Sequence, residues 1–209
     1  MKATALLLAL AMTTAAGAQN TAYRELLLDS AAALLQADKH DRALAVYNTV
    51  LDIEPDNTTA IFMRAYIKVR KRLYKEARLD YNHLLRLDPT DPKALISLAI
   101  LNDKDRRPKE AMETINRFIE YYPQTAEGYL VRAGFEMDRR QDEVALYDFT
   151  RAVELSPQDP EPLLARARFH IARRNKREVR SDLKAALDLG ANPGEAAGGM
   201  KSPTPIPSP

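Results

Sequence analysis

Apolar and polar residues alternate along this chain in blocks that fit amphipathic helices, and short polar segments separate the blocks. One block ends in Val50-Leu51-Asp52-Ile53 just before Pro55, and another ends in Ala152-Val153-Glu154-Leu155 just before Pro157. Proline cannot continue a helix, because it lacks the backbone donor and its ring clashes with the preceding turn. The pattern therefore predicts pairs of helices of about 14 residues each, with a polar turn inside each pair and a proline after it.

Three series of residues show that the helix pairs recur with one period. Each series advances by 34 positions. The series are Ala31, Ala65, Ala99, Ala133 and Ala167; Ala43, Ala77, Ala111 and Ala145; and Pro55, Pro89, Pro123 and Pro157. Together they set repeats at 24–57, 58–91, 92–125, 126–159 and 160–193 without an insertion.

A 34-residue unit of two helices, with small residues at positions 8 and 20 and proline at 32, resembles the tetratricopeptide repeat family. Position 24, which is aromatic or large in that family, holds Tyr47, Tyr81, Ile115, Phe149 and Leu183. The resemblance covers nearly all of the mature chain up to residue 193. It implies an all-α fold, a right-handed α-solenoid of antiparallel helix hairpins over residues 19–190.

Arginine and aspartate occur together inside single repeats. Position 7 is arginine and position 23 is aspartate in the second, fourth and fifth repeats, and the other two repeats lack both. The predicted pairs are Arg64 with Asp80, Arg132 with Asp148, and Arg166 with Asp182. Because half-buried charges need partners, we interpret these pairs as structural links between the two helices of one hairpin.

The family resemblance also implies that the first helix of each repeat lines a concave groove. The apolar groove residues are then Leu28, Phe62, Tyr66, Val69, Ile96, Ile100, Leu130, Met137, Leu164 and Ile171. Such a groove suits a protein or peptide segment, with Phe62 and Tyr66 as anchors. The alternative is that these side chains pack against neighbouring helices.

The distribution of charged residues predicts a second candidate binding surface. Lys+Arg 31 nearly balances Asp+Glu 29, so no nucleic-acid partner is expected. Basic clusters nevertheless recur at the turns inside the repeats: Arg70-Lys71-Arg72, Arg106-Arg107, Arg139-Arg140 and Arg173-Arg174-Asn175-Lys176-Arg177. The alternative function is therefore a structural subunit that binds an anionic envelope polymer along this edge, or that assembles through its end faces.

The two ends of the array differ in sequence. The first helix carries the apolar run Leu26-Leu27-Leu28, which allows a head-to-head homodimer. The last predicted helix, 176–189, mixes Arg177, Arg180 and Lys184 with apolar positions. We interpret its polar side as a cap that keeps the end of the array in water.

Both termini of the chain lie outside the repeats. Lys2, an apolar run over 3–12 and small residues up to Ala18 predict a signal peptide over 1–18, and hence export to the periplasm or beyond. No transmembrane segment is expected after its removal. Residues 191–209 are rich in proline and small residues, which predicts a disordered tail.

No catalytic chemistry is expected from this sequence. The chain has no cysteine, and its three histidines, His40, His83 and His170, fall at different repeat positions. We therefore predict a non-enzymatic scaffold without metal or cofactor, which holds other proteins.

Overall fold

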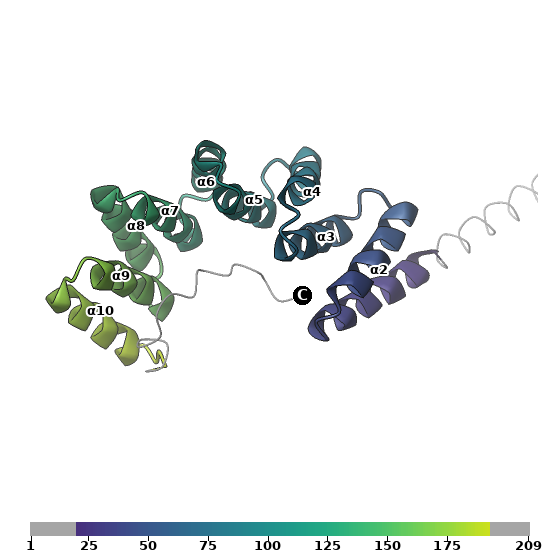
Figure 1. Cartoon of the computed structure of the whole chain (residues 1–209). Coiled ribbons are helices and arrows are strands. Elements are labelled where there is room, and N and C mark those ends of the chain that lie inside the picture. Colours follow the sequence, from purple (N-terminus) through teal and green to yellow (C-terminus); the bar gives the residue numbers. More distant parts are fainter. Residues whose placement is uncertain (1–19, 193–209) are drawn as a thin grey trace, which may run out of the picture. The chain divides into compact units, whose positions relative to one another are not determined.

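The computed structural model describes residues 20–192, and all regular secondary structure in that range is helical (Figure 1). The signal peptide predicted at 1–18 and the tail beyond residue 192 lie outside the described residues. A helix over residues 20–36 comes first. It is followed by α2 His40–Ile53, α3 Thr58–Arg70, α4 Tyr74–Leu87, α5 Pro92–Lys104, α6 Pro108–Tyr121, α7 Ala126–Asp138, α8 Asp142–Leu155, α9 Pro160–Ala172 and α10 Lys176–Asp188.

Side-chain caps and prolines fix where several helices begin. Asn57 Oδ1 accepts a hydrogen bond from the Ala60 backbone N–H at 2.9 Å, and Asp91 does the same for Ala94 at 2.7 Å. These caps satisfy donors that have no partner within the helix. Proline stands in the first turn of α5, α6 and α9, where its missing N–H costs nothing.

The turn inside each repeat uses left-handed backbone geometry at one equivalent residue. Asp38, Arg72, Arg106, Arg140 and Arg174 have φ between 57° and 61°. This geometry is unfavourable for residues with a Cβ and usually falls to glycine or asparagine. It reverses the chain after the first helix, so that the second helix runs back along it.

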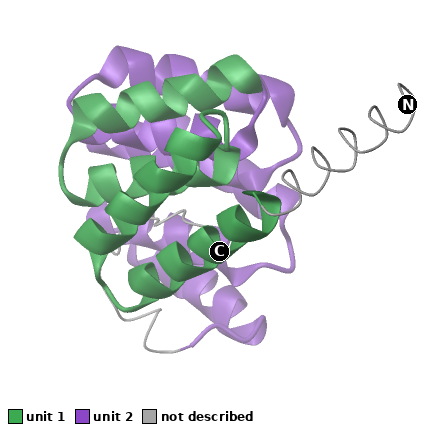
Figure 2. Cartoon of the chain, turned by 90° about the vertical axis from the view of Figure 1, so that its right-hand side faces the viewer, with its two compact units in different colours: residues 1–89, 209 green, residues 90–208 purple. Residues whose placement is uncertain are grey.

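The chain divides into two compact units at residues 89 and 90 (Figure 2). In the first unit, α3 packs against both α2 and α4. Alanines at repeat positions 8 and 20, among them Ala43, Ala65 and Ala77, are fully buried there. A larger side chain at these positions would overpack the close approach of the two helices.

The second unit contains the hairpins α5/α6, α7/α8 and α9/α10. Its first helices contact one another in the order α5, α7, α9, and they lie on the inner side of the unit while α6, α8 and α10 lie outside (Figure 1). One core cluster joins Ala133, Ala145, Phe149 and Phe169. Each hairpin therefore buries its apolar side against its partner helix and the adjoining repeat.

Candidate functional site

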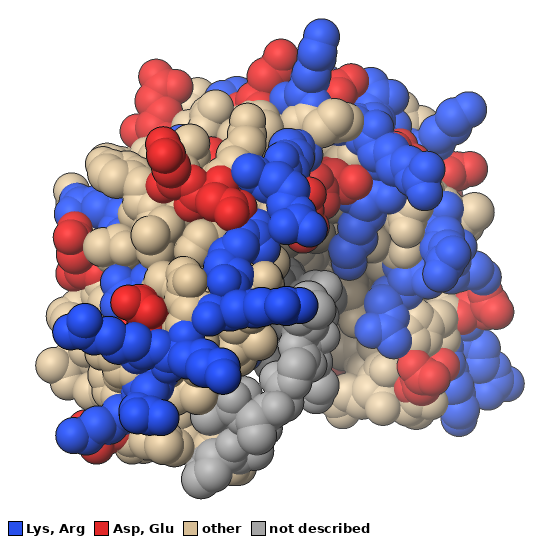
Figure 3. All heavy atoms as spheres, turned by 60° about the vertical axis from the view of Figure 1, so that its left-hand side comes forward, with Lys and Arg blue, Asp and Glu red and all other residues tan. Residues whose placement is uncertain are grey.

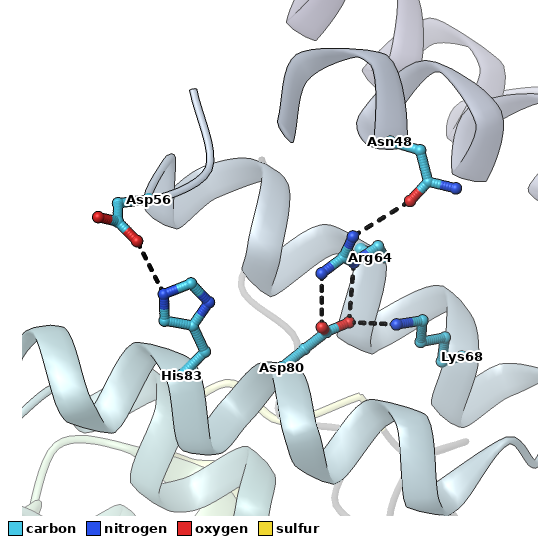
Figure 4. Close-up of polar contacts among 6 residues, drawn as sticks. All are labelled: Asn48, Asp56, Arg64, Lys68, Asp80 and His83. Atoms are coloured by element: carbon cyan, nitrogen blue, oxygen red, sulfur yellow. Dashed lines mark hydrogen bonds and ion pairs between the residues drawn. The ribbon is translucent and has the colours of Figure 1, made fainter. Parts of the chain in front are cut away.

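Arg64 connects three helices of the first unit. Its Nε and Nη2 atoms donate to the two carboxylate oxygens of Asp80 at 3.0 and 2.7 Å, and Lys68 Nζ donates to the same carboxylate at 2.7 Å (Figure 4). Arg64 Nη1 also donates to Asn48 Oδ1 at 3.2 Å, on the second helix of the preceding repeat. One guanidinium thus links a hairpin internally and ties it to its predecessor.

The second unit repeats this arrangement twice. Arg132 binds Asp148 at 2.6 and 2.9 Å and Asn116 at 2.8 Å. Arg166 binds Asp182 at 3.0 and 2.7 Å and Thr150 at 3.3 Å. The three aspartates are buried, so these pairs hold the repeats together and offer nothing to a ligand. Sequence reasoning missed the second link, although the polar residues Asn48, Asn116 and Thr150 all stand at repeat position 25.

The residues predicted to line a groove fall into two groups. Ile96 and Leu164 are each only 3% exposed and belong to the core, so neither contacts a partner. Their place in the prediction was wrong, because the helix face assigned to the groove also meets the neighbouring helices. Ile171 is exposed, and the others are half-buried: Leu28, Phe62, Tyr66, Val69, Ile100, Leu130 and Met137.

The half-buried groove residues lie on the first helix of their repeats, and both units contain some of them. Phe62, Tyr66 and Val69 stand at i, i+4 and i+7 of α3 and so share one helix face. Phe62 meets Tyr81 edge to face with 5.7 Å between ring centroids, which fixes the ring. In the second unit, Leu130 and Met137 pack partly on the core. The open part of the predicted groove in the first unit is therefore the exposed side of Phe62, Tyr66 and Val69.

The basic clusters at the turns inside the repeats, which we call the basic edge, contain two sets of residues with different roles. Lys71, Arg139 and Arg173 at position 14 form ion pairs with acids of the preceding repeat, and Arg139 lies 2.9 Å from Asp103. Arg139 and Arg173 also stack on Phe135 and Phe169. These cations are structural ties between repeats.

The cations at position 15 behave differently. Arg72, Arg106, Arg140 and Arg174 occupy the left-handed turn residue and are exposed. Within residues 20–192, none of their guanidinium groups forms an ion pair. Of these two sets, only the position-15 arginines are therefore available to an anion.

Glu136 is an acid that sequence reasoning missed. It is 4% exposed on α7, and its Oε2 atom is a buried oxygen without a hydrogen-bond partner. Burial, with the nearby Asp148 carboxylate, raises the pKa of Glu136 to about 7, although Arg132 and Arg139 act in the opposite direction. It stands at position 11, where Lys68 and His170 instead face the aspartate of their own hairpins at 2.7 and 3.9 Å. A polar residue at position 11 of four repeats was the signal that pointed to this site.

Known proteins share this sequence pattern and this fold. A model of the tetratricopeptide repeat family matches residues 28–92. A tetratricopeptide repeat protein from Parabacteroides merdae has a TM-score of 0.72 at 20% identity, covering 83% of this chain and 68% of that chain. PilF of Pseudomonas aeruginosa gives 0.69 at 16% identity, with 85% and 81% covered. YrrB, described as having an unusual peptide-binding site, gives 0.56 at 21% identity, with 82% and 88% covered.

Residues 28–92 match the tetratricopeptide repeat family, and the described part of the chain has the fold of this family. The predictions of this family and of an all-α solenoid are thus confirmed. The tetratricopeptide fold is one that supports protein–protein interaction, and proteins built on it are in general non-enzymatic adaptors. No curated protein is similar enough in sequence to add to this comparison.

The described part of the chain has neither a metal site nor a membrane-spanning helix. Within residues 20–192, no three His, Cys, Asp or Glu side chains gather as a metal site requires. His83 instead contacts Asp56 at 2.8 Å (Figure 4). None of the helices in that range combines the length and apolar character needed to cross a bilayer.

Glu136 gives the stability of this protein a defined pH dependence. A folded-state pKa of about 7, above the ordinary value of 4.5, means that the unfolded chain binds fewer protons between these values. The free energy of unfolding should therefore fall as pH rises from about 4.5 to about 7. We expect Glu136→Gln to remove this fall and to be more stable than the wild type at pH 8 by on the order of 2 kcal/mol, measured by urea unfolding at pH 5 and pH 8.

Two further variants sharpen the pH experiment. Glu136→Lys reproduces the arrangement of Lys68 beside Asp80 and should also be more stable than the wild type at pH 8. Glu143→Gln, on the exposed surface of α8, is the matched control. Equal pH profiles for the wild type and Glu136→Gln would contradict the assignment.

Proposed function

We propose that this protein is an exported scaffold that holds a segment of a partner protein on the apolar face of its first helices. The observation that carries the proposal is the helix face of Phe62, Tyr66 and Val69, which stays half-exposed while the remainder of α3 is tied into the array. Aromatic side chains in such a setting supply large contact areas at low entropic cost. An amphipathic helix or an extended apolar peptide has the complementary chemistry.

Two further observations support the proposal. YrrB, which shares the fold, is described as a protein with a peptide-binding site. The leader predicted at residues 1–18 would place the array in the periplasm or outside the cell, in the service of envelope assembly or secretion. Amino-terminal sequencing of the protein isolated from the envelope fraction should begin at Gln19. Unprocessed protein in the cytoplasm would contradict export.

The apolar face is tested by capture from an envelope extract. The double variant Phe62→Ala/Tyr66→Ala should capture about one tenth or less of the protein that the wild type captures. Anchors of this kind contribute roughly 2 kcal/mol each to binding. The matched control is Leu79→Ala/Tyr147→Ala, which removes exposed side chains from the second helices α4 and α8. Circular dichroism melting of both variants separates lost binding from lost folding. Undiminished capture by a folded double variant would reject this face.

The position-15 arginines favour a second candidate function, binding of an anionic envelope polymer. A left-handed arginine costs about 1 kcal/mol relative to glycine, and the same cost recurs at Arg72, Arg106, Arg140 and Arg174. No structural contact within residues 20–192 compensates it by an ion pair. A polymer with regularly spaced negative charges offers the missing counter-charge.

Replacing these arginines by glycine should separate stability from binding. Arg106→Gly/Arg140→Gly/Arg174→Gly is expected to raise the free energy of unfolding by up to about 1 kcal/mol per site, while retention on a heparin column falls. Lys93→Gln/Lys104→Gln/Lys109→Gln removes the same net charge from exposed positions of the same unit and serves as the control. Equal retention of the two triple variants would show that net charge alone governs binding and would exclude a site on this edge.

A further inference from the structure

The outer side of α10 carries charges at positions where other second helices meet the next repeat. Arg180 and Leu187 are exposed, and Leu187 keeps 42% of its surface in water. Met112 and Leu146, equivalent to Arg180, are half-buried, as are Ile119 and Val153, equivalent to Leu187. We call Lys176, Arg177, Arg180, Lys184 and Leu187 the C-terminal end face.

The four cations of the C-terminal end face gather on one side of α10. Within residues 20–192, none of them forms an ion pair. Figure 3 shows the side of the molecule on which α10 lies, with Lys and Arg side chains crowded over it. No described acid lies within ion-pair distance of these four cations, so an acidic surface has a favourable interaction with this face.

The first helix of the chain exposes the side by which the other first helices contact the preceding repeat. Leu26 is 65% exposed, and Asp29, Ser30 and Ala33 beside it are also exposed. At the position of Leu26 the other repeats bury a small or rigid residue, such as Ala60, and at the position of Ala33 they bury Ile67, Phe135 and Phe169. These positions therefore define the side by which a first helix meets the preceding repeat. We call Glu25, Leu26, Asp29, Ser30 and Ala33 the N-terminal end face.

Side-chain sizes at this kind of contact are inversely related. A Cβ on Gly128 would lie 2.6 Å from Phe118, so the large residue at position 27 requires glycine at position 3 of the next repeat. Val50 at position 27 is followed by Ala60 at position 3. On α10 position 27 is Ala186, which is fully buried, so the exposed apolar residue of the C-terminal end face is Leu187 at position 28. The first helix carries the exposed Leu26 at position 3, so each end face has one exposed leucine.

Charges at the two end faces are also complementary. Asn48, Asn116 and Thr150 at position 25 each accept a hydrogen bond from an arginine at position 7 of the following repeat. On α10 position 25 is Lys184, which would repel such an arginine. The first helix has Ser30 at position 7 and the acids Glu25 and Asp29 on the same surface. The first helix therefore would not repel Lys184, and its two acids would attract the cations of α10.

We propose that the N-terminal end face of a second copy of this chain docks on the C-terminal end face, in the place of a next repeat. The contact joins two different surfaces, so a complex of two copies still has one free face of each kind, and assembly continues as concentration rises. Leu26 lies against Leu187, and Glu25 and Asp29 lie among the cations of α10. The contact lies outside the apolar face of Phe62 and Tyr66, so it stands or falls independently of the proposed function.

Sedimentation velocity of the protein purified from its native host tests this contact. We expect species larger than one chain that grow with protein concentration and shrink in 0.5 M salt, since exposed charges more than about 4 Å apart are largely screened at that ionic strength. Leu26→Asp alone and Arg180→Glu/Lys184→Glu alone should each be monomeric. These positions are exposed, so both variants should melt as the wild type does.

Mixing the two monomeric variants gives the decisive measurement. Leu26→Asp retains an intact C-terminal end face, and Arg180→Glu/Lys184→Glu retains an intact N-terminal end face, so the mixture should form dimers and nothing larger. A wild type that stays monomeric at every concentration would overturn the proposal and leave the cations of α10 as a solubilising cap. A dimer abolished by Leu26→Asp but kept by Arg180→Glu/Lys184→Glu would also overturn it, in favour of head-to-head pairing.

Discussion

Asp148→Arg is expected to lower the free energy of unfolding by about 3–5 kcal/mol, the usual cost of an unpaired buried charge. Asp148 is fully buried and accepts two hydrogen bonds from Arg132. Its replacement places two guanidinium groups in one buried site and also deprives Arg132 of its acceptor. Because Arg132 is also bound to Asn116 of the preceding repeat, the loss should spread across two repeats. Thermal and urea unfolding measure the effect.

The control for Asp148→Arg makes the same change of charge at the surface. Asp138 is exposed at the end of α7, and Asp138→Arg should change stability by less than about 0.5 kcal/mol. The exchange Arg132→Asp/Asp148→Arg restores opposite charges and should recover part of the loss. Similar melting temperatures for Asp148→Arg and Asp138→Arg would show that the buried pair contributes nothing to stability.

Gly128→Ala should destabilise the protein by about 1–3 kcal/mol, the cost of overpacking a close contact. The added Cβ would lie 2.6 and 2.8 Å from two ring carbons of Phe118 and 2.9 Å from Ile119. Alanine ordinarily stabilises a helix relative to glycine. The expected loss of stability in Gly128→Ala therefore comes from the packing clash alone. Gly134→Ala, in the same helix with nothing within 4 Å, is the matched control and should stabilise by roughly 0.5–1 kcal/mol.

A second substitution tests the cause of the Gly128 effect. Phe118→Leu removes the atoms that an added Cβ would meet and should make Gly128→Ala tolerable. The double variant would then carry the same leucine and alanine as Leu84 and Ala94, which occupy the equivalent positions one repeat earlier. A double-mutant cycle should give a favourable coupling of about 1 kcal/mol or more between the two sites. Additive effects of the two changes would mean that Phe118 is not the obstacle.

The sequence predicted the fold because the repeat signal is redundant. Alanine, proline and the apolar pattern all report one period, so departures such as Val179 at position 20 of the fifth repeat leave the fold intact. The arginine–aspartate pairs could be located for a similar reason. Two residues that are present or absent together, sixteen positions apart in a hairpin, have one simple structural explanation.

The repeat pattern could not predict which individual side chains are buried or which ion pairs they form. Ile96 and Leu164 share a position with the half-buried Phe62, yet their neighbours cover them. The position-14 cations find acids at three different positions of the preceding repeat, which a periodic pattern does not contain. Glu136 was missed because its raised pKa arises from burial and from the Asp148 carboxylate, which the chain reaches only after turning into the next helix.

The triple contacts of arginine also set how far unfolding spreads. Arg64 couples the first repeat to the second, Arg132 the third to the fourth, and Arg166 the fourth to the fifth, so the opening of one repeat removes a hydrogen-bond acceptor or donor from its neighbour. The third repeat has Leu98 at this position, and leucine cannot donate. Within each unit, amide hydrogens of repeats that an arginine couples would then exchange together, as one cooperative group.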